Sequence, residues 1–195
     1  MHFLTFLVAL LFTALQAQAV VIPRKSVRDD DNTPASPDVT VKLMTANGTM
    51  IDAKPGADST QSNFVRTSTT QSICIRGDQT GAMTGHFARS DDCQELVRFL
   101  DTEWLGYWDT WDYESAALAI ITAGTCAVYI SGVDTFNGHV WIGNQDIADA
   151  TSLVISKYGH DGLVAGAGQF NCNQPNGATT LDWSIQDSGK GSKDM

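Results

Sequence analysis

The chain has 195 residues and a formal net charge of −10 at neutral pH. Its acidity is concentrated over residues 71–188, where fifteen acidic and four basic residues give a net charge of −11. Such a surface repels phosphate backbones and anionic lipid head groups, so we expect neither a nucleic-acid-binding protein nor a membrane-surface protein.

The first nineteen residues have the pattern of an export signal. Residues 3–15 form an almost unbroken apolar run that is too short to cross a bilayer as a helix. Ala17-Gln18-Ala19 follows, with small residues at the positions that signal peptidase reads. The pattern predicts a signal peptide over residues 1–19 and a secreted, extracellular chain with no membrane span. A membrane anchor at the same place is the alternative interpretation.

Residues 20–70 are polar, contain no cysteine and predict a flexible leader that cannot bury enough apolar surface to order itself. One stretch differs. Val41 and Leu43 alternate with polar residues before Asn47-Gly48, which predicts a small hairpin near residues 39–53. Asn47 also starts the single glycosylation sequon of the chain, so we expect a glycan there.

The region 71–188 begins with a predicted strand at residues 73–75 and a helix that opens at Asp91 or Asp92. Gln94 or Glu95, three residues later, would complete a capping-box-like arrangement. The apolar positions of this helix fall on one stripe at helical spacing. They are Cys93, Leu96, Val97, Leu100 and Trp104.

Three further strands are predicted over residues 118–121, 126–131 and 139–142, and a second helix follows. We expect Asn144 to be the N-cap of that helix and Gly159 its C-cap. Strands over 163–172 and 179–186 complete the domain, which occupies 71–188, and residues 189–195 are predicted to be a disordered tail. In the last strand Leu181, Trp183 and Ile185 should face inward, with Asp182 and Ser184 outward. This order predicts an α+β fold, an antiparallel sheet with two helices packed on one face.

The four cysteines, Cys74, Cys93, Cys126 and Cys172, all lie in this domain. An even number behind an export signal predicts a disulfide framework, because the export route is oxidising. Four cysteines allow three pairings, and their spacing does not choose among them.

No catalytic constellation stands out, so the sequence predicts a protein that is not an enzyme and has no catalytic residues, metal or cofactor. The serine-hydrolase pattern G-x-S-x-G is absent, and an even cysteine count leaves no free thiol for a nucleophile. His86, His139 and His160 lack the i, i+4 spacing of a helical metal site. The acidic residues are too many to define a glycosidase pair.

The most unusual stretch is 101–114, in which five aromatic residues lie among five acids. Trp104 continues the helix stripe and should be a core residue. Tyr107, Trp108 and Trp111 are candidates for an interaction surface, because such side chains stack on sugars and form the centres of protein interfaces. The alternative is that they pack over the core, since tryptophan is highly buried on average.

Five short pieces of the domain, taken in order and with their spacing, resemble a known family. They are Asp91-Asp92-Cys93-Gln94-Glu95-Leu96, Gly124-Thr125-Cys126-Ala127-Val128, Ile142-Gly143-Asn144-Gln145-Asp146-Ile147, Gly168-Gln169-Phe170 with Cys172, and Leu181-Asp182-Trp183-Ser184-Ile185. The domain is similar to the fungal extracellular-protein-two or necrosis-inducing-factor family, and the leader lies outside the resemblance.

The resemblance implies a secreted effector that provokes or assists the death of host plant tissue and has no enzymatic activity. It also implies a killer-toxin-like α/β sandwich and the pairing of Cys74 with Cys172 and of Cys93 with Cys126. The related toxins are basic and richer in disulfides, whereas this domain is acidic. Channel block by a positive side chain is therefore not expected here.

These observations lead us to expect a non-enzymatic fungal effector that acts outside the cell. Its partner would be an unknown host protein or a cell-wall glycan. Two alternatives remain: an antimicrobial, killer-toxin-like protein, and a secreted protein that binds or cleaves glycans.

Overall fold

The computed structural model describes residues 41–44, 49–52, 64–110, 117–131, 140–174 and 177–190. All of these belong to one unit, Ser36–Met195. The other unit, Met1–Ala35, contains the predicted signal peptide and lies outside the described residues. Within the described residues, no helix has both the length and the apolar character needed to cross a membrane.

Helix α1 (Ser90–Thr102) buries the apolar stripe that its sequence predicts, but it starts without the predicted capping box. Arg89 is its N-cap, and no side chain bonds to the free backbone N–H groups there. The carboxylate of Asp92 instead accepts two hydrogen bonds from Thr125, outside the helix. The predicted capping box is therefore wrong, because the Asp92 side chain bonds to Thr125, which is distant in sequence, and not to the start of its own helix.

The start of helix α2 (Asn144–Tyr158) also differs from the prediction. Its N-cap is Gly143, not Asn144, and the carboxylate of Asp146 accepts the Gly143 N–H at 2.8 Å. The predicted end is correct: Gly159 is the C-cap, and its N–H donates to the carbonyl of Ile155.

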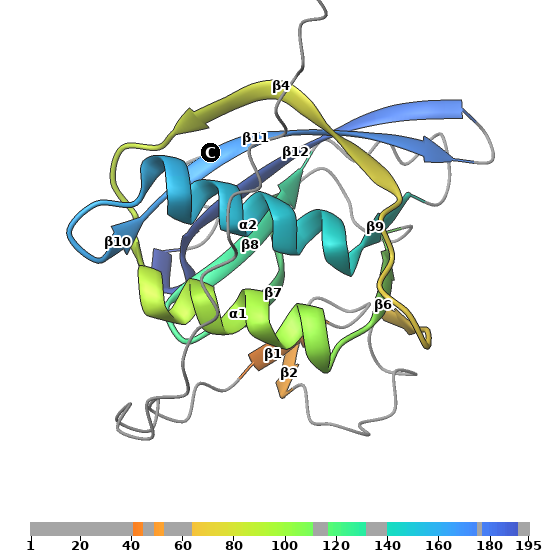
Figure 1. Cartoon of the computed structure of the whole chain (residues 1–195), viewed down its shortest axis with the longest axis horizontal. Coiled ribbons are helices and arrows are strands. Elements are labelled where there is room, and N and C mark those ends of the chain that lie inside the picture. Colours follow the sequence, from red (N-terminus) through yellow and green to blue (C-terminus); the bar gives the residue numbers. More distant parts are fainter. Residues whose placement is uncertain are drawn as a thin grey trace, which may run out of the picture. The chain divides into compact units, whose positions relative to one another are not determined.

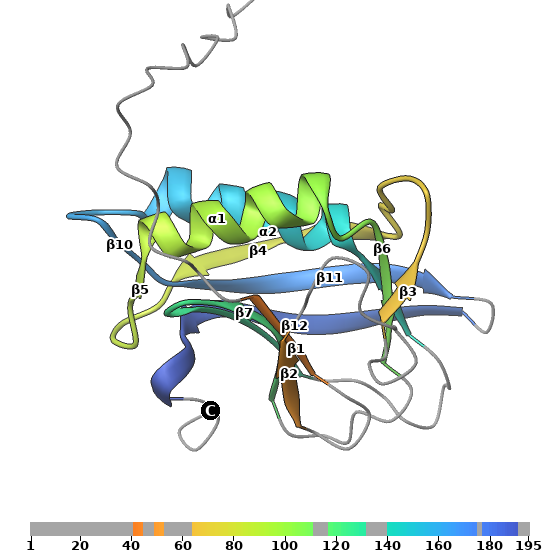
Figure 2. The ribbon, with the colours of Figure 1, turned by 90° about the horizontal axis from the view of Figure 1, so that it is seen from below.

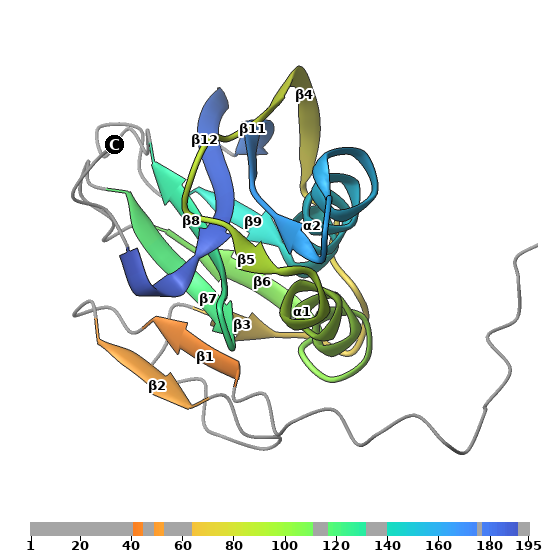
Figure 3. The ribbon, with the colours of Figure 1, turned by 90° about the vertical axis from the view of Figure 1, so that its left-hand side faces the viewer.

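The main sheet has seven strands, and every neighbouring pair in it is antiparallel. Their spatial order is β2 (Met50–Asp52), β1 (Val41–Met44), β7 (Leu118–Ala123), β8 (Cys126–Ser131), β12 (Gly177–Asp187), β11 (Gly166–Gln174) and β4 (Cys74–Ala82). Both helices lie on one face of this sheet (Figures 1 and 2), and they run side by side, as Figure 3 shows nearly end-on. The predicted α+β architecture is confirmed.

Two smaller sheets complete the fold. One has the order β3 (Phe64–Arg66), β6 (Gly106–Asp109) and β9 (Trp141–Gly143), and the other pairs β5 (Ala88–Arg89) with β10 (Leu163–Val164). A short 3₁₀ turn, η3 (Ser188–Lys190), ends the described chain. It contains two residues that the sequence analysis placed in the disordered tail; residues 191–195 lie outside the described part.

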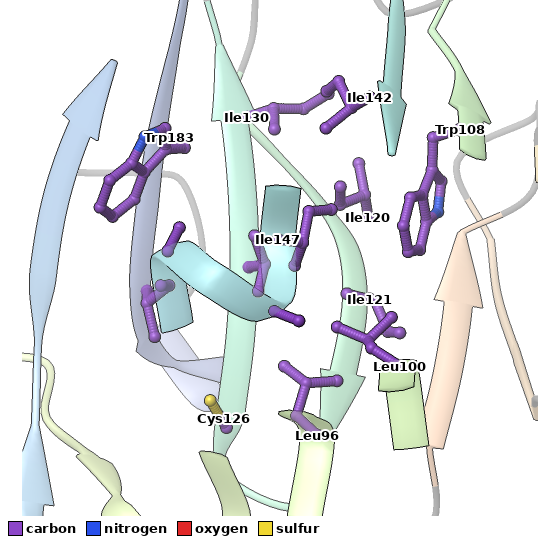
Figure 4. Packing of buried hydrophobic residues seen from close by; sticks show 14 of the residues in the cluster. Leu96, Leu100, Trp108, Ile120, Ile121, Cys126, Ile130, Ile142, Ile147 and Trp183 are labelled. Carbon is purple, nitrogen blue, oxygen red and sulfur yellow. The ribbon is translucent and has the colours of Figure 1, made fainter. Parts of the chain in front are cut away.

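The core fills the space between the helices and the sheets. Figure 4 shows Leu96 and Leu100 of α1 and Ile147 of α2 gathered with Ile120 and Ile121 of β7, and all five are fully buried. Burying an aliphatic side chain of this size contributes roughly 1.5–3 kcal/mol relative to leaving it exposed. This contact layer fixes the helices on the sheet.

Three short strands, β1, β2 and β3, lie in the region that was predicted to be a flexible leader. Strands β1 and β2 pair antiparallel, in the place where the hairpin was predicted, and β1 also pairs with β7 at the edge of the main sheet. Strand β3 pairs with β6, and its Phe64 is a core residue. The packed unit therefore includes residues before the predicted boundary at 71, because a few apolar residues in a polar segment suffice to form short strands that pair with the sheets.

Two disulfides staple the domain in the pairing that the family resemblance implied. Cys74 in β4 is bonded to Cys172 in β11, and Cys93 in α1 is bonded to Cys126 in β8. The partners are 98 and 33 residues apart in sequence. In the chain-entropy model, closing loops of this length stabilises a fold by about 3–5 kcal/mol per bridge.

Candidate functional site

The aromatic segment that the sequence singled out, 101–114, contributes residues 106–109 to strand β6, and the side chains of this strand divide between the two sides of the small sheet. Trp108 is fully buried and its ring centroid lies 4.6 Å from that of Phe64, edge to face. Trp104 is also buried and packs on Phe64 and Phe99. The candidate interaction role for Trp108 is therefore wrong: its side of β6 faces the core. Trp111 lies outside the described residues.

The opposite side of the same sheet carries an aromatic surface. Val65 pairs with Tyr107 in register, so the two side chains share the outer side. Trp141 of β9 lies beside them, with its ring centroid 5.7 Å from that of Tyr107. Val65 is 40% exposed, and Tyr107 and Trp141 are half-buried. We call these three residues the aromatic face.

Sequence reasoning found Tyr107 but missed Val65 and Trp141. Neither residue belongs to the aromatic segment, and the pairing of β3 and β9 with β6 joins positions more than thirty residues apart. A strand was predicted at residues 139–142, but a predicted strand alone does not say which of its sides faces solvent.

The motif residues around Cys93 and Cys126 form a structural clamp. The Oδ2 atom of Asp92 accepts hydrogen bonds from the backbone N–H and the hydroxyl of Thr125, both at 2.7 Å. Between them Gly124 adopts φ +56°, and a Cβ on it would lie 2.6 Å from the Asp92 carboxyl carbon. The clamp thus holds the β7–β8 turn against α1, next to the Cys93–Cys126 disulfide, which joins α1 to β8.

A second clamp is built at the start of α2. The carboxylate of Asp146 is mostly buried and accepts hydrogen bonds from the backbone N–H groups of Ile73, Cys74 and Gly143 at 2.8–3.0 Å, and from the hydroxyl of Ser72 at 3.0 Å. Burial raises the pKa of Asp146 above its usual value, although the four hydrogen bonds act in the opposite direction. The clamp holds the start of β4, with its cysteine, against α2.

Because these carboxylates are engaged by the backbone, the motif residues that carry the family resemblance have a scaffold role. Binding chemistry must be sought on the surfaces that the scaffold displays. One is the aromatic face; the other is a groove on the main sheet.

The groove lies on the face of the main sheet opposite the helices. In β12 the residues Leu181, Trp183 and Ile185 belong to the core, so the alternating Asp182 and Ser184 point to the other face. This confirms the inward positions of Leu181, Trp183 and Ile185 and the outward position of Asp182, which is exposed. Ser184 points to the same face as Asp182 but is only 4% exposed, so its predicted exposure is wrong: its cross-strand neighbours on that face, Tyr129 and Ala167, flank it. A hollow of about 470 Å³ lies over this face, between β4, β8, β11 and β12.

The floor of the groove consists of cross-strand rows. In one row Gln169 pairs with Asp182, which in turn pairs with Ser131. The amide Nε2 of Gln169 donates to Oδ1 of Asp182 at 2.9 Å. In the adjacent row Tyr129 pairs with Ser184. Burial, together with the carboxylate of Asp187, raises the pKa of Tyr129, so its phenol remains protonated at neutral pH.

The histidines do not form a site with one another or with a metal-binding cluster in the described part of the chain. His86 adopts φ +56°, and its carbonyl accepts the N–H of Asp187. His160 is exposed, 3.8 Å from the carboxylate of Asp161, with its ring against Phe87. His139 and the sequon residue Asn47 lie outside the described residues.

A comparison with protein families places the domain in a known family. The model of a family described as "Pathogen effector; putative necrosis-inducing factor" matches residues 73–172. This stretch contains both disulfides, both helices and the carboxylates of both clamps, Asp92 and Asp146. No curated protein matches the chain.

Proposed function

The chain belongs to this pathogen-effector family, because residues 73–172 are 100 of its 195 residues, and from this membership we propose that it is a secreted fungal effector. It promotes the death of host plant cells by binding an extracellular host component, and it does so without catalysis. The fungal source and the plant host follow from the resemblance of the motif pieces to the necrosis-inducing-factor family.

The observation that carries the binding role is the aromatic face. Val65, Tyr107 and Trp141 come from three different strands and place apolar surface next to solvent on a rigid sheet. Aromatic residues on rigid elements bind partners at low entropic cost and are enriched among interface hot spots. An aromatic side chain in the core, such as that of Trp108, contributes to stability but has no surface with which to contact a partner.

Two features support action outside the cell. Both disulfides persist only in an oxidising compartment, such as the extracellular space. They also tie β4 to β11 and α1 to β8. These crosslinks favour resistance of the folded domain to proteolysis, because cleavage requires local opening.

We propose no catalytic step, because the two carboxylates nearest the disulfides are engaged in hydrogen bonds within the fold. Asp92 and Asp146 accept hydrogen bonds from backbone N–H groups and hydroxyls, so their lone pairs hold the fold together. A general acid or base needs a carboxyl group that can exchange its proton with a bound substrate.

The test is infiltration of the purified, oxidised protein into leaves, with variants that change the aromatic face alone. Val65→Lys adds a charge at its rim, and Ile75→Lys is the matched control, since Ile75 is a strand residue 67% exposed on a different sheet. We expect the wild type and Ile75→Lys to cause tissue collapse and Val65→Lys to cause much less, with equal thermal stability.

Two results would contradict the proposal. If Val65→Lys and Tyr107→Ala are folded and as active as the wild type, the aromatic face is not the binding surface. If folded wild-type protein causes no response in any host tissue, whereas the pathogen that secretes it causes necrosis there, the effector role itself fails. A Cys93→Ser variant controls for the need for the folded, disulfide-bonded form.

A further inference from the structure

The groove on the open face of the main sheet has the properties of a ligand site, and the proposed effector role does not use it. Its volume of about 470 Å³ lies in the range of roughly 300–1,000 Å³ that small-molecule sites occupy. The groove is formed by four hydrogen-bonded strands, two of which, β4 and β11, are also joined by a disulfide.

One side of the groove is lined by residues with little or no side chain. Gly81, Ala167 and Gly168 leave the surface of β4 and β11 flat. A Cβ built on Gly81 would meet no other atom within 4 Å, so the space above that residue is open. A flat, open surface of Cα and Cβ atoms can accept the C–H side of a ring that lies on it.

The other side offers hydrogen-bonding groups in one row across three strands. Gln169, Asp182 and Ser131 are cross-strand neighbours, a relation that places side chains about 5 Å apart. The bond between Gln169 and Asp182 occupies one amide proton and one carboxylate oxygen. The groups that remain are the Oε1 of Gln169 and the Oδ2 of Asp182 as acceptors, and the second amide proton of Gln169 as a donor. The Ser131 hydroxyl both donates and accepts.

Charge restricts the ligand further. The described lining residues include one carboxylate and no lysine, arginine or histidine, and the surrounding domain has a net charge of −11 over residues 71–188. Phosphates and uronic acids are therefore repelled. The carboxylate of Asp182 is the one charged group that a cationic ligand could pair with, and the other polar groups that line the groove are neutral.

We infer that the groove binds a short, uncharged oligosaccharide, with hydroxyl groups donating to Gln169 and Asp182 and a sugar ring lying on Gly81 and Ala167. A neutral ligand with neighbouring hydroxyl donors fits adjacent acceptors in a row, and its C–H side fits the flat surface beside them. This site lies on the main sheet, whereas the aromatic face lies on the small sheet, so the two can be tested independently.

The experiment measures binding of hexasaccharides to the oxidised wild-type chain by calorimetry, supported by NMR shifts. Cellohexaose represents plant wall glycan, chitohexaose represents fungal wall glycan, and an oligogalacturonide of the same length is the anionic probe. We expect saturable binding of at least one uncharged hexasaccharide and none of the oligogalacturonide. Whichever uncharged sugar binds more tightly identifies the source.

Two variants and a control locate the site. Gly81→Leu extends a side chain into the open space, where its Cβ meets no other atom within 4 Å, and Gln169→Ala removes a hydrogen-bonding side chain. Ser152→Leu on the exposed side of α2 is the control. Each groove variant should weaken binding by about tenfold or more, the equivalent of one lost polar contact, and Ser152→Leu should bind as the wild type does.

The inference is overturned if no uncharged hexasaccharide binds, if the oligogalacturonide binds best, or if folded Gly81→Leu and Gln169→Ala bind like the wild type. Leaf necrosis is not part of the measurement. If no sugar binds, the effector proposal is therefore unaffected. If the protein causes no necrosis in leaves, the inference about the groove is unaffected.

Discussion

The carboxamide oxygen of Asn144 accepts a hydrogen bond from the backbone N–H of Gln71 at 2.8 Å, although the two residues are 73 positions apart. The same oxygen accepts the N–H of Gly106 at 3.2 Å, and the amide nitrogen donates to the carbonyl of Leu100 at 2.8 Å. One fully buried side chain thus links α1, the strand β6 and the segment before β4 to the first residue of α2.

Replacing this side chain should destabilise the whole domain. Asn144→Ala leaves two backbone N–H groups and a carbonyl without partners, and each buried unsatisfied group costs about 1–3 kcal/mol. We expect the free energy of unfolding, measured by urea denaturation, to fall by about 3 kcal/mol or more. Asn144→Asp should also be destabilising, because it places an oxygen against the Leu100 carbonyl. Ser152→Ala is the control; equal stability of Asn144→Ala and this control would contradict the assignment.

The packed unit should require residues before 71. Phe64 is buried against Trp104 and Trp108, so a chain that starts at residue 71 exposes two tryptophans. In the longer chain, Phe64→Ala should lower the free energy of unfolding by about 3–5 kcal/mol, whereas Val65→Ala on the exposed side of the same strand should change it little. The measurement is urea unfolding of chains that start at residues 61 and 71. Coincident unfolding curves would show that β3 is dispensable.

The features that could be predicted from the sequence are those that depend on residues close together in the chain. The apolar stripe of α1 and the alternation of Leu181, Trp183 and Ile185 follow from the geometry of a helix and a strand, and both are present. The end of α2 at Gly159 is likewise set by its immediate neighbours.

The misplaced predictions share one physical cause, which is competition from contacts distant in sequence. Asp92 and Asn144 have the chemistry of helix caps, but their side chains bond to Thr125, Gln71 and Leu100 instead. Similarly, the alternation in β6 predicts that Tyr107 and Trp108 point to opposite sides. Which side is the core depends on β3 and β9, which the local sequence does not identify.

The turn at Gly124 allows a matched pair of substitutions. Gly124 and Gly162 both have positive φ, +56° and +75°, but a Cβ would clash with Asp92 at the first position and meet nothing within 4 Å at the second. Gly162→Ala should therefore cost only the backbone strain of about 1–2 kcal/mol. Gly124→Ala should cost clearly more, because it also displaces the carboxylate from Thr125. Equal unfolding free energies for the two variants would disprove a tight clamp.

The buried carboxyl group of Asp146 should make stability depend on pH in a defined direction. Burial is the largest influence and raises its pKa, so the folded protein binds this proton more tightly than the unfolded chain, in which an aspartate pKa is about 3.9. Its contribution to stability is therefore fully present below that unfolded value. The contribution is lost as pH rises through the higher pKa of the folded state.

Asp146→Asn provides the comparison, because it need not break the clamp. One oxygen of Asp146, Oδ2, accepts all three backbone N–H groups, while Oδ1 contacts only the Ser72 hydroxyl, which can reverse its donor role. The amide can thus reproduce all four contacts without titrating, whereas Asp146→Ala loses them at about 1–3 kcal/mol for each donor left unsatisfied. In urea unfolding at a series of pH values, wild-type stability relative to Asp146→Asn should decrease as pH rises from about 3.9 through the pKa of the folded state. If the relative stability increases over that interval, the hydrogen bonds outweigh burial and the pKa is lowered instead.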